Sequence, residues 1–292
     1  MPEEYLKNCP LLRDTSFMNL MVRRICNVLI IANPYDAFML EDDGRVDEKI
    51  FDEYAKLGLR YPPRFFQVAS AREADEELQN TSFDLVICMP GAEDNDVFDI
   101  ARSIKERFRE IPLVVLTPFS HGITRRMENE DLSIFEYVFC WLGNTDLLIS
   151  IIKLIEDKMN LEHDVNEAGV QMILLVEDSI RYYSSILPYL YRFVLRQSLE
   201  FATEALNSQL EMLRMRGRPK IVLARNYEEA WELYTRYKDQ TLGVISDCRF
   251  PRGGVTDELA GFDLLSAMRR EDPYLPLILQ SSETDRRSLA RK

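Results

Sequence analysis

The feature that most constrains the fold of this chain is a regular alternation of short apolar runs with amphipathic helical segments. The apolar runs are uninterrupted by charge, which is typical of parallel strands covered by helices on both faces of a sheet. Segments between them, such as "NDVFDIARSIKERF", have the periodicity of helices with one apolar face. In the first half, the predicted strands are Asn27–Ala32, Phe83–Pro90, Ile111–Pro118 and Glu136–Trp141. The first half is therefore predicted to be an α/β domain.

The same pattern restarts in the second half, so the chain contains an internal repeat. The stretch "VASAREADEELQNTSFDLVICMP" aligns with "LARNYEEAWELYTRYKDQTLGVISD". We expect an α/β fold of two tandem flavodoxin-like domains, each a doubly wound parallel sheet. The predicted strands of the second half are Met172–Val176, Lys220–Ala224, Leu242–Ser246 and Leu275–Ser281.

The expected domain organisation follows from these runs and from the acidic stretch between them. It comprises an N-terminal helical segment (1–27), a first domain (28–160), a linker (161–170) and a second domain (171–292). Between the first two strands of the second domain, residues 179–219 are predicted to be mostly helical, with Pro188 breaking or kinking the helix.

Composition removes several classes of function. The 292 residues include 36 Lys+Arg and 49 Asp+Glu, a net charge of −13, so we expect no nucleic-acid partner. No apolar stretch reaches the ~20 residues of a membrane-spanning helix, and the polar N-terminus does not resemble a secretory signal. Five scattered cysteines without a C-x-x-C pair indicate reduced thiols in the cytoplasm. With only two histidines, a His-rich metal site or a Ser-His-Asp triad is not expected.

Polar residues follow three strands of the second half. Glu177 and Asp178 come after the first strand, Asp247 after the third and Ser281 after the fourth. In a flavodoxin-like sheet these strand ends are neighbours. Three carboxylates at such a point repel one another unless a cation lies among them, and oxygen ligands without histidine suit Mg²⁺.

The motifs "ILLVEDS", "VISDCRFP" and "LILQSSE", in that order, resemble the receiver domain of response regulators. The resemblance implies that Glu177, Asp178, Asp247 and the backbone carbonyl of Arg249 bind Mg²⁺. It also implies that Asp247 accepts a phosphoryl group and that Ser281 is the switch hydroxyl that hydrogen-bonds it. The phosphoryl donor would be a phosphohistidine protein or a small acyl phosphate, and the role would be signal transduction.

The second domain departs from the family pattern in two respects. The family has a lysine after a fifth strand, but Lys292 is too close to Ser281 to be that residue. We therefore expect the second domain to lack its last strand and helix, and the apolar run Leu275–Ser281 to be a sheet edge that something shields. The loop "CRFPRGGVTDELAG" is also longer than in the family.

The first domain resembles a receiver without its chemistry. Asn33 and Pro34 occupy the place of the acid pair, and Met89 occupies that of the phosphoacceptor. Thr117 matches the switch hydroxyl, but the lysine position offers Cys140 or Trp141. This domain is expected to be unable to accept a phosphoryl group.

Alternatives remain at the level of the sequence. The two domains, with "YDAFMLEDDGR" and "MLRMRGRPKI", resemble the N-terminal region of bacterial phosphoenolpyruvate synthase-like proteins, which implies a regulatory part of a larger phosphotransferase. In that case the partner is a downstream domain of the same protein; a homodimer is the other possibility. Taken singly, Asp178 is also compatible with a helix cap and Asp247 with a turn, and a silent structural tandem is a third interpretation.

Overall fold

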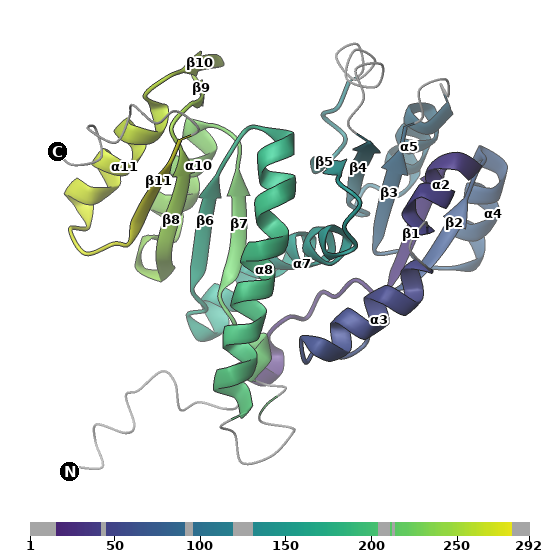
Figure 1. Ribbon diagram of the computed structural model, residues 1–292, viewed down its shortest axis with the longest axis horizontal. Coiled ribbons are helices and arrows are strands. Elements are labelled where there is room, and N and C mark those ends of the chain that lie inside the picture. Colours follow the sequence, from purple (N-terminus) through teal and green to yellow (C-terminus); the bar gives the residue numbers. More distant parts are fainter. Residues whose placement is uncertain are drawn as a thin grey trace. The chain divides into compact units, whose positions relative to one another are not determined.

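The computed structural model describes residues 16–41, 45–90, 96–118, 131–203, 211 and 214–281 (Figure 1). The chain divides into two compact units. One comprises residues 24–155 and 180–192, and the other comprises residues 1–23, 156–179 and 193–292. Each unit contains one parallel sheet, and each is described by itself below. Most of the predicted N-terminal helical segment lies outside the described residues, which begin with the short 3-10 helix η2 (Ser16–Asn19).

The first sheet has five parallel strands in the order β2-β1-β3-β4-β5, the flavodoxin-like order. Its strands are β1 (Asn27–Ala32), β2 (Arg64–Val68), β3 (Leu85–Met89), β4 (Leu113–Pro118) and β5 (Tyr137–Trp141). The helices of this part of the chain are α2 (Pro34–Glu41), α3 (Val46–Lys56), α4 (Ala71–Asn80) and α5 (Asp96–Arg107).

Both faces of the first sheet are buried, as the apolar strands predict. On one face, Leu29, Val86 and Val115 pack with residues of α4 and α5 in a single core cluster. The alternate residues Ile30 and Ile87 are 3% and 0% exposed, so the opposite face is covered too. The expected α/β doubly wound architecture is confirmed.

The second sheet repeats this order over four strands, β11-β8-β6-β7, again all parallel. Its strands are β6 (Met172–Val176), β7 (Lys220–Ala224), β8 (Thr241–Asp247) and β11 (Leu277–Gln280). Helices α10 (Tyr227–Arg236) and α11 (Ala260–Glu271) pack on one face around Leu174 and Val244, and the 3-10 helix η3 (Lys238–Gln240) precedes β8.

The acidic stretch that was expected to be a linker is helical. Helix α7 runs from Asp146 to Ala168 and ends where Gly169 adopts a φ of 62°. Asp157 and Asp164 are fully buried, and they pair with two cations beside β7, Arg218 at 2.7 Å and Lys220 at 2.7 Å. A buried carboxylate is tolerated only with such partners, so both acids fix the helix, and Asp164, which lies in the expected linker, is buried in it. The structure therefore corrects the expected conformation of residues 161–168 from linker to helix. The expected bounds of the two domains remain predictions.

Helix α8 (Ile180–Thr203) continues through Pro188, so of the two expected effects of this proline a break does not occur, and a kink stays a prediction. Its first turns protect the outer edge of β5. The hydroxyl of Tyr183 donates to the carbonyl of Val138, and the Cys140 N–H donates to Ser184 Oγ at 2.9 Å. These bonds satisfy backbone groups that an edge strand otherwise leaves open.

The opposite outcome holds at β11 in the second sheet. β8 pairs with one side of β11, and within the described residues no strand pairs with the other side. Ile278 is 54% exposed, whereas Leu275 is 3% exposed. The expectation that the run Leu275–Ser281 is shielded is therefore wrong for Ile278 and correct for Leu275.

Among the helices of the described residues, none combines the length and the apolar character needed to cross a bilayer.

Candidate metal and phosphoacceptor site

The acid pair lies where β6 ends and the chain turns into α8. Glu177 still belongs to the sheet through its backbone, because its N–H donates to the carbonyl of Ala224 on β7 at 3.0 Å. Its side chain is buried and accepts a hydrogen bond from the Ser179 N–H at 3.0 Å. This bond holds one carboxylate oxygen in place at the strand end.

Asp247 ends the neighbouring strand β8. The register of the two strands pairs Val176 with Ser246. Glu177 and Asp247 are the next residues of these strands, so the two acids lie side by side at the sheet edge. The Arg249 N–H donates to Asp247 Oδ2 at 3.1 Å. One carboxylate oxygen each from Glu177, Asp178 and Asp247 lie within 4.8 Å of one another. The structure thus brings together the three acids that the sequence singled out.

Crowding and burial disfavour negative charge at this point. Burial raises the pKa of Glu177 to about 7, and Asp247 and Asp178 add to the rise while the Ser179 N–H opposes it. Burial also raises the pKa of Asp178, again with a contribution from Asp247, and the guanidinium of Arg249 opposes this shift. Such a cluster fits a divalent cation with oxygen ligands, since the cation removes the repulsion.

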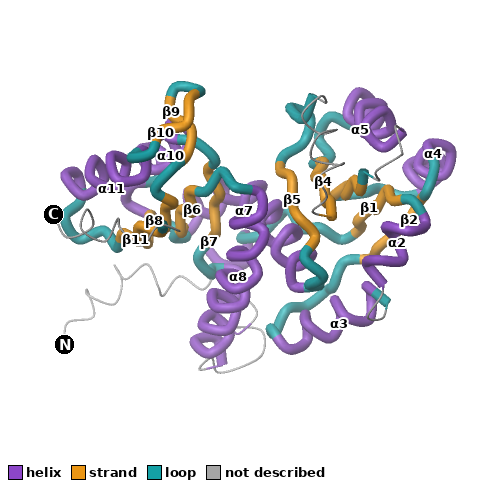
Figure 2. Tube along the Cα trace, turned by 45° about the horizontal axis from the view of Figure 1, so that its top comes forward, coloured by secondary structure: helices purple, strands orange, loops and turns teal. Residues whose placement is uncertain are grey.

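The loop after Asp247 is a hairpin of two short antiparallel strands, β9 (Phe250–Arg252) and β10 (Val255–Asp257). Figure 2 shows this hairpin beside α10 and α11, with which β9 makes contact. The sequence marked the loop as unusually long, but its strands were not predicted. Gly253-Gly254 is a dipeptide typical of two-residue hairpin turns, and both glycines have the positive φ that such a turn requires.

Gly261 is a further residue that the sequence analysis missed. Its N–H donates to the carbonyl of Cys248 at 3.0 Å, at the start of α11. A Cβ atom at this position would lie 1.9 Å from the carbonyl oxygen of Asp247. Only glycine allows α11 to begin this close to the end of β8.

The remaining predicted site residues lie at the same edge of the sheet. Arg249 is two residues after Asp247, between β8 and β9. Ser281 follows Gln280, and Gln280 is the register partner of Asp247. The roles assigned to the Arg249 carbonyl and the Ser281 hydroxyl stay predictions.

The corresponding edge of the first sheet has a different character. Asn33 and Asp36 bond to each other there, and Met89 is buried at the end of β3. Thr117 is also buried, on β4, and Cys140 lies on β5 with its thiol pKa raised by burial. The residues that the sequence aligned with the acid pair and the phosphoacceptor are therefore a capping amide and a core methionine.

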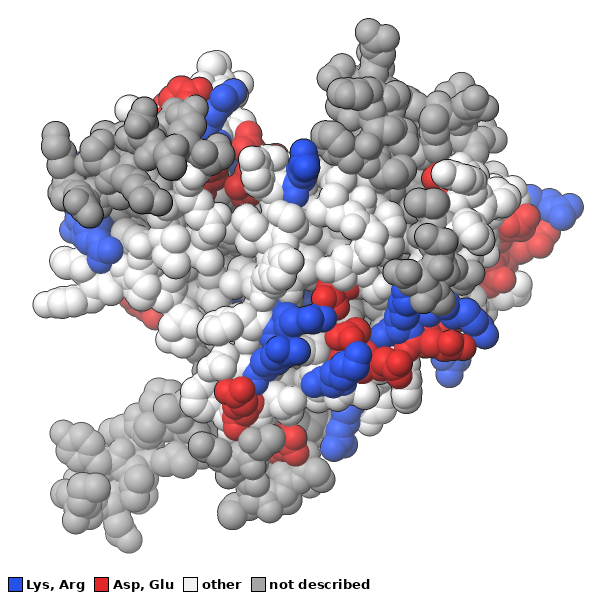
Figure 3. All heavy atoms as spheres, viewed as in Figure 1, with Lys and Arg blue, Asp and Glu red and all other residues white. Residues whose placement is uncertain are grey.

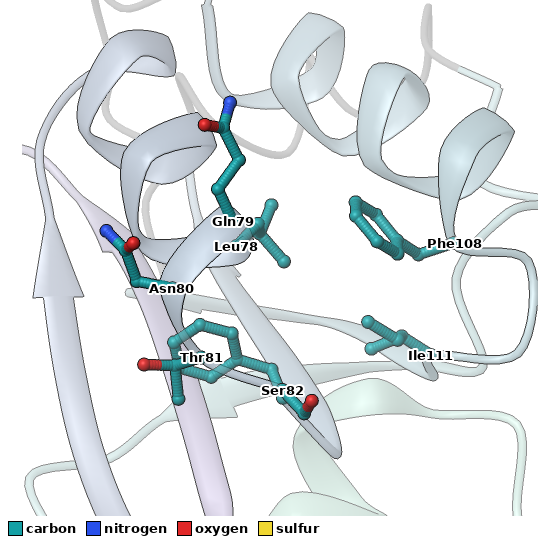
Figure 4. Close-up of a pocket in the computed structure, with 8 residues that line it drawn as sticks. Leu78, Gln79, Asn80, Thr81, Ser82, Phe108 and Ile111 are labelled. Carbon is teal, nitrogen blue, oxygen red and sulfur yellow. The ribbon is translucent and has the colours of Figure 1, made fainter.

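The compact unit of residues 24–155 and 180–192 has two hollows. One, of about 290 Å³, is bounded by the end of α4 and the turn before β4, and Figure 4 shows Leu78, Phe108 and Ile111 pointing toward one another in it. The other, of about 330 Å³, lies against α3 and includes Arg192 and Glu53, which pair at 3.3 Å. Figure 3 shows basic and acidic side chains interleaved around α3.

A scan against protein-family models finds no match, and a search of curated proteins finds none either. Among solved structures, NtrX from Brucella abortus in complex with ADP aligns with 91% of this chain and 62% of its own, at 10% identity and a TM-score of 0.36. GanP, a glucose-galactose binding protein from Geobacillus stearothermophilus, aligns with 88% of this chain and 78% of its own, at 11% identity and a TM-score of 0.24. The chain thus spans less than two thirds of the NtrX chain. Both scores are too low to bear on function, and the receiver-like fold rests on the strand order of the two sheets.

Proposed function

We propose that the second sheet carries a phosphoacceptor site of the receiver type, in which Asp247 is phosphorylated in a Mg²⁺-dependent reaction. One observation supports this above all. Three carboxylate oxygens from two neighbouring strand ends lie within 4.8 Å of one another, at the edge of a doubly wound sheet where ligands bind.

The donor set fits Mg²⁺. Glu177, Asp178 and Asp247 would supply carboxylate oxygens and Arg249 its backbone carbonyl, the hard oxygen ligands that this ion prefers. Bound there, Mg²⁺ would neutralise charge on the oxygens of the transferring phosphoryl group. Because Glu177 holds a proton up to about pH 7, binding of the metal would release that proton.

The transfer itself asks little of the protein besides position. A carboxylate oxygen of Asp247 attacks the phosphorus atom of the donor, and a new O–P bond forms. The bond from phosphorus to the donor breaks, and its electron pair leaves with an imidazole nitrogen of a phosphohistidine protein or a carboxylate oxygen of an acyl phosphate. Asp247 is oriented for this by the hydrogen bond from the Arg249 N–H. Ser281, on the adjacent strand end, would then bond to the phosphoryl group.

This chemistry serves either of two roles. The module would act in signal transduction, with the first domain as a non-phosphorylatable partner, or it would regulate a larger phosphoenolpyruvate synthase-like phosphotransferase. A second copy of the chain or a downstream domain would then read the phosphorylated state. Within the first domain, the buried Met89 at the matching strand end supports a role without phosphoryl chemistry.

The test is phosphorylation by acetyl phosphate with Mg²⁺, followed by intact-mass spectrometry. We expect the mass of one phosphoryl group to be added to the wild-type chain and none to Asp247→Asn. Asp239→Asn is the matched control and should react like wild type. Asp239 is an exposed acid in η3, which precedes β8, and Asp247 lies at the other end of that strand. Absence of phosphorylation in wild type, or its persistence in Asp247→Asn, would refute the proposal.

A further inference from the structure

The hairpin after Asp247 leaves the sheet edge and returns to it at nearly the same point. It begins at Cys248, turns at Gly253-Gly254 and comes back to Gly261, whose N–H bonds to the Cys248 carbonyl. Phe250, near its base, is fully buried in the core of the second unit. The hairpin and the backbone beside Asp247 therefore form one closed loop, and a shift of one is expected to move the other.

Arg252 ties this hairpin to both helices that flank it. Its Nη1 lies 3.0 Å from the Asp263 carboxylate on α11 and 3.7 Å from Asp257 on β10. Its guanidinium carbon lies 4.3 Å from the centre of the Tyr227 ring on α10. A guanidinium over an aromatic ring that also makes ion pairs is restricted in orientation as well as in position.

Two more contacts complete the attachment. The Gly253 N–H donates to Glu228 Oε1 on α10 at 2.9 Å. Nearer the acids, Arg249 pairs with Glu258 at 3.3 Å, across the two arms of the loop. The peptide that carries the Arg249 carbonyl thus lies between a strand end held by the sheet and a hairpin held by Arg252.

We infer that Arg252 is a positioning residue for the metal site, which fixes the direction of the Arg249 carbonyl through the hairpin. The inference rests on the proposed function, because that carbonyl matters only if Asp247 and its neighbours bind Mg²⁺. A backbone carbonyl contributes to a metal site only when its peptide plane is held toward the ion. Residues that orient metal ligands typically account for a 10- to 100-fold change in affinity when they are replaced.

The experiment is a calorimetric Mg²⁺ titration of the full chain, with a thermal unfolding curve for each variant. Arg252→Ala is expected to raise the Mg²⁺ dissociation constant about tenfold. Tyr227→Phe keeps the ring beneath the guanidinium and should bind like wild type, whereas Tyr227→Ala should bind more weakly. The chain also offers a matched control: Arg236 pairs with Glu162 at 2.7 Å and stacks on Tyr237 at 5.4 Å, and neither contact touches the hairpin. Arg236→Ala should leave the dissociation constant unchanged.

The outcomes separate this inference from the proposed function. If wild type binds Mg²⁺ and Arg252→Ala binds it equally well, Arg252 has no positioning role and the proposed function stands. If Arg236→Ala weakens binding as much as Arg252→Ala does, the effect does not depend on the attachment of the hairpin and the inference fails. If wild type gives no Mg²⁺ response, both fail together.

Discussion

Each of the two sheets has a junction, the turn that leads from its first strand, β1 or β6, into the following helix. The junction has the same place in both topologies, but its residues differ. In the first sheet, Asn33 follows β1 and α2 begins at the next residue. Asn33 Oδ1 accepts the Asp36 N–H at 2.8 Å, and its amide donates to the Asp36 carboxylate at 2.8 Å. This reciprocal pair caps the start of α2 and satisfies the side-chain amide of Asn33 within the junction.

The junction after β6 leaves its polar groups less well satisfied. Glu177 accepts one backbone N–H, yet burial and the nearby Asp247 and Asp178 still raise its pKa to about 7. A carboxylate that is hard to ionise, in a place where an amide would cap the helix, is typical of a functional site. The comparison shows that one fold satisfies the polar groups of this junction in one copy and leaves three crowded carboxylates there in the other.

The first and largest expected effect is on stability, and it compares two glycines: Gly261 at the start of α11 and Gly143 after β5. Gly261→Ala places a methyl group against the Asp247 carbonyl, which we expect to destabilise the chain by about 3 kcal/mol and to weaken Mg²⁺ binding. Gly143→Ala, after β5 of the first sheet, meets no neighbouring atom within 4 Å and is strained only by its φ of 74°. That variant should cost about 1 kcal/mol and leave Mg²⁺ binding intact.

Urea unfolding of both variants, with a Mg²⁺ titration of each, checks this prediction. Equal losses of stability in the two variants would show that the close approach of α11 to Asp247 has no special role. Unchanged Mg²⁺ binding in Gly261→Ala would show that this approach does not shape the site.

The second effect is a pH dependence of stability that belongs to the second sheet. Native Glu177 keeps its proton up to about pH 7, whereas an unfolded glutamate loses it near pH 4.5. Between these values the unfolded state binds fewer protons, so the free energy of unfolding should fall as pH rises from about 4.5 to 7. The contribution is on the order of 3 kcal/mol at most, and Glu177→Gln should remove it.

Denaturant unfolding of metal-free protein across this pH range, for wild type and Glu177→Gln, measures the difference. Asn33→Ala in the first sheet removes a helix cap and a bond to the Asp36 carboxylate, so it should lower stability by roughly 1 kcal/mol while the fall between about pH 4.5 and 7 that belongs to Glu177 remains. A Glu177→Gln variant with the pH profile of wild type would contradict the electrostatic account of the acid cluster.

Much of the fold was predictable because the strands are buried on both faces. The bounds of β1, β6 and β7 match the apolar runs of the sequence. Strand β2 was missed because it lies at a sheet edge, where the exposed Arg64 and Gln67 interrupt the apolar pattern.

The acids of the site were predictable for a related reason, since strand ends of a parallel sheet converge on one edge. The roles of Gly261 and Arg252 were not predictable from the sequence. The position of Gly261 depends on a backbone approach between residues far from any motif, and the attachment of Arg252 depends on three separate elements meeting. The linker expected at 161–170 includes Asp164, because a sequence does not show that Lys220 lies opposite this acid.

The most direct test of the central claim is the thermal stabilisation that Mg²⁺ gives to three forms of the chain: wild type, Asp178→Asn and Asn33→Asp. A ligand at ten times its dissociation constant stabilises the state that binds it by about 1.4 kcal/mol. The account predicts this stabilisation for wild type and its loss in Asp178→Asn. It also predicts that the Mg²⁺ stabilisation of Asn33→Asp equals that of wild type, because the added carboxylate and Asp36 have the buried Met89, and no third carboxylate, at the phosphoacceptor position. Equal Mg²⁺ responses in wild type and Asp178→Asn, or a larger response in Asn33→Asp, would contradict the claim that the second sheet alone carries the ion.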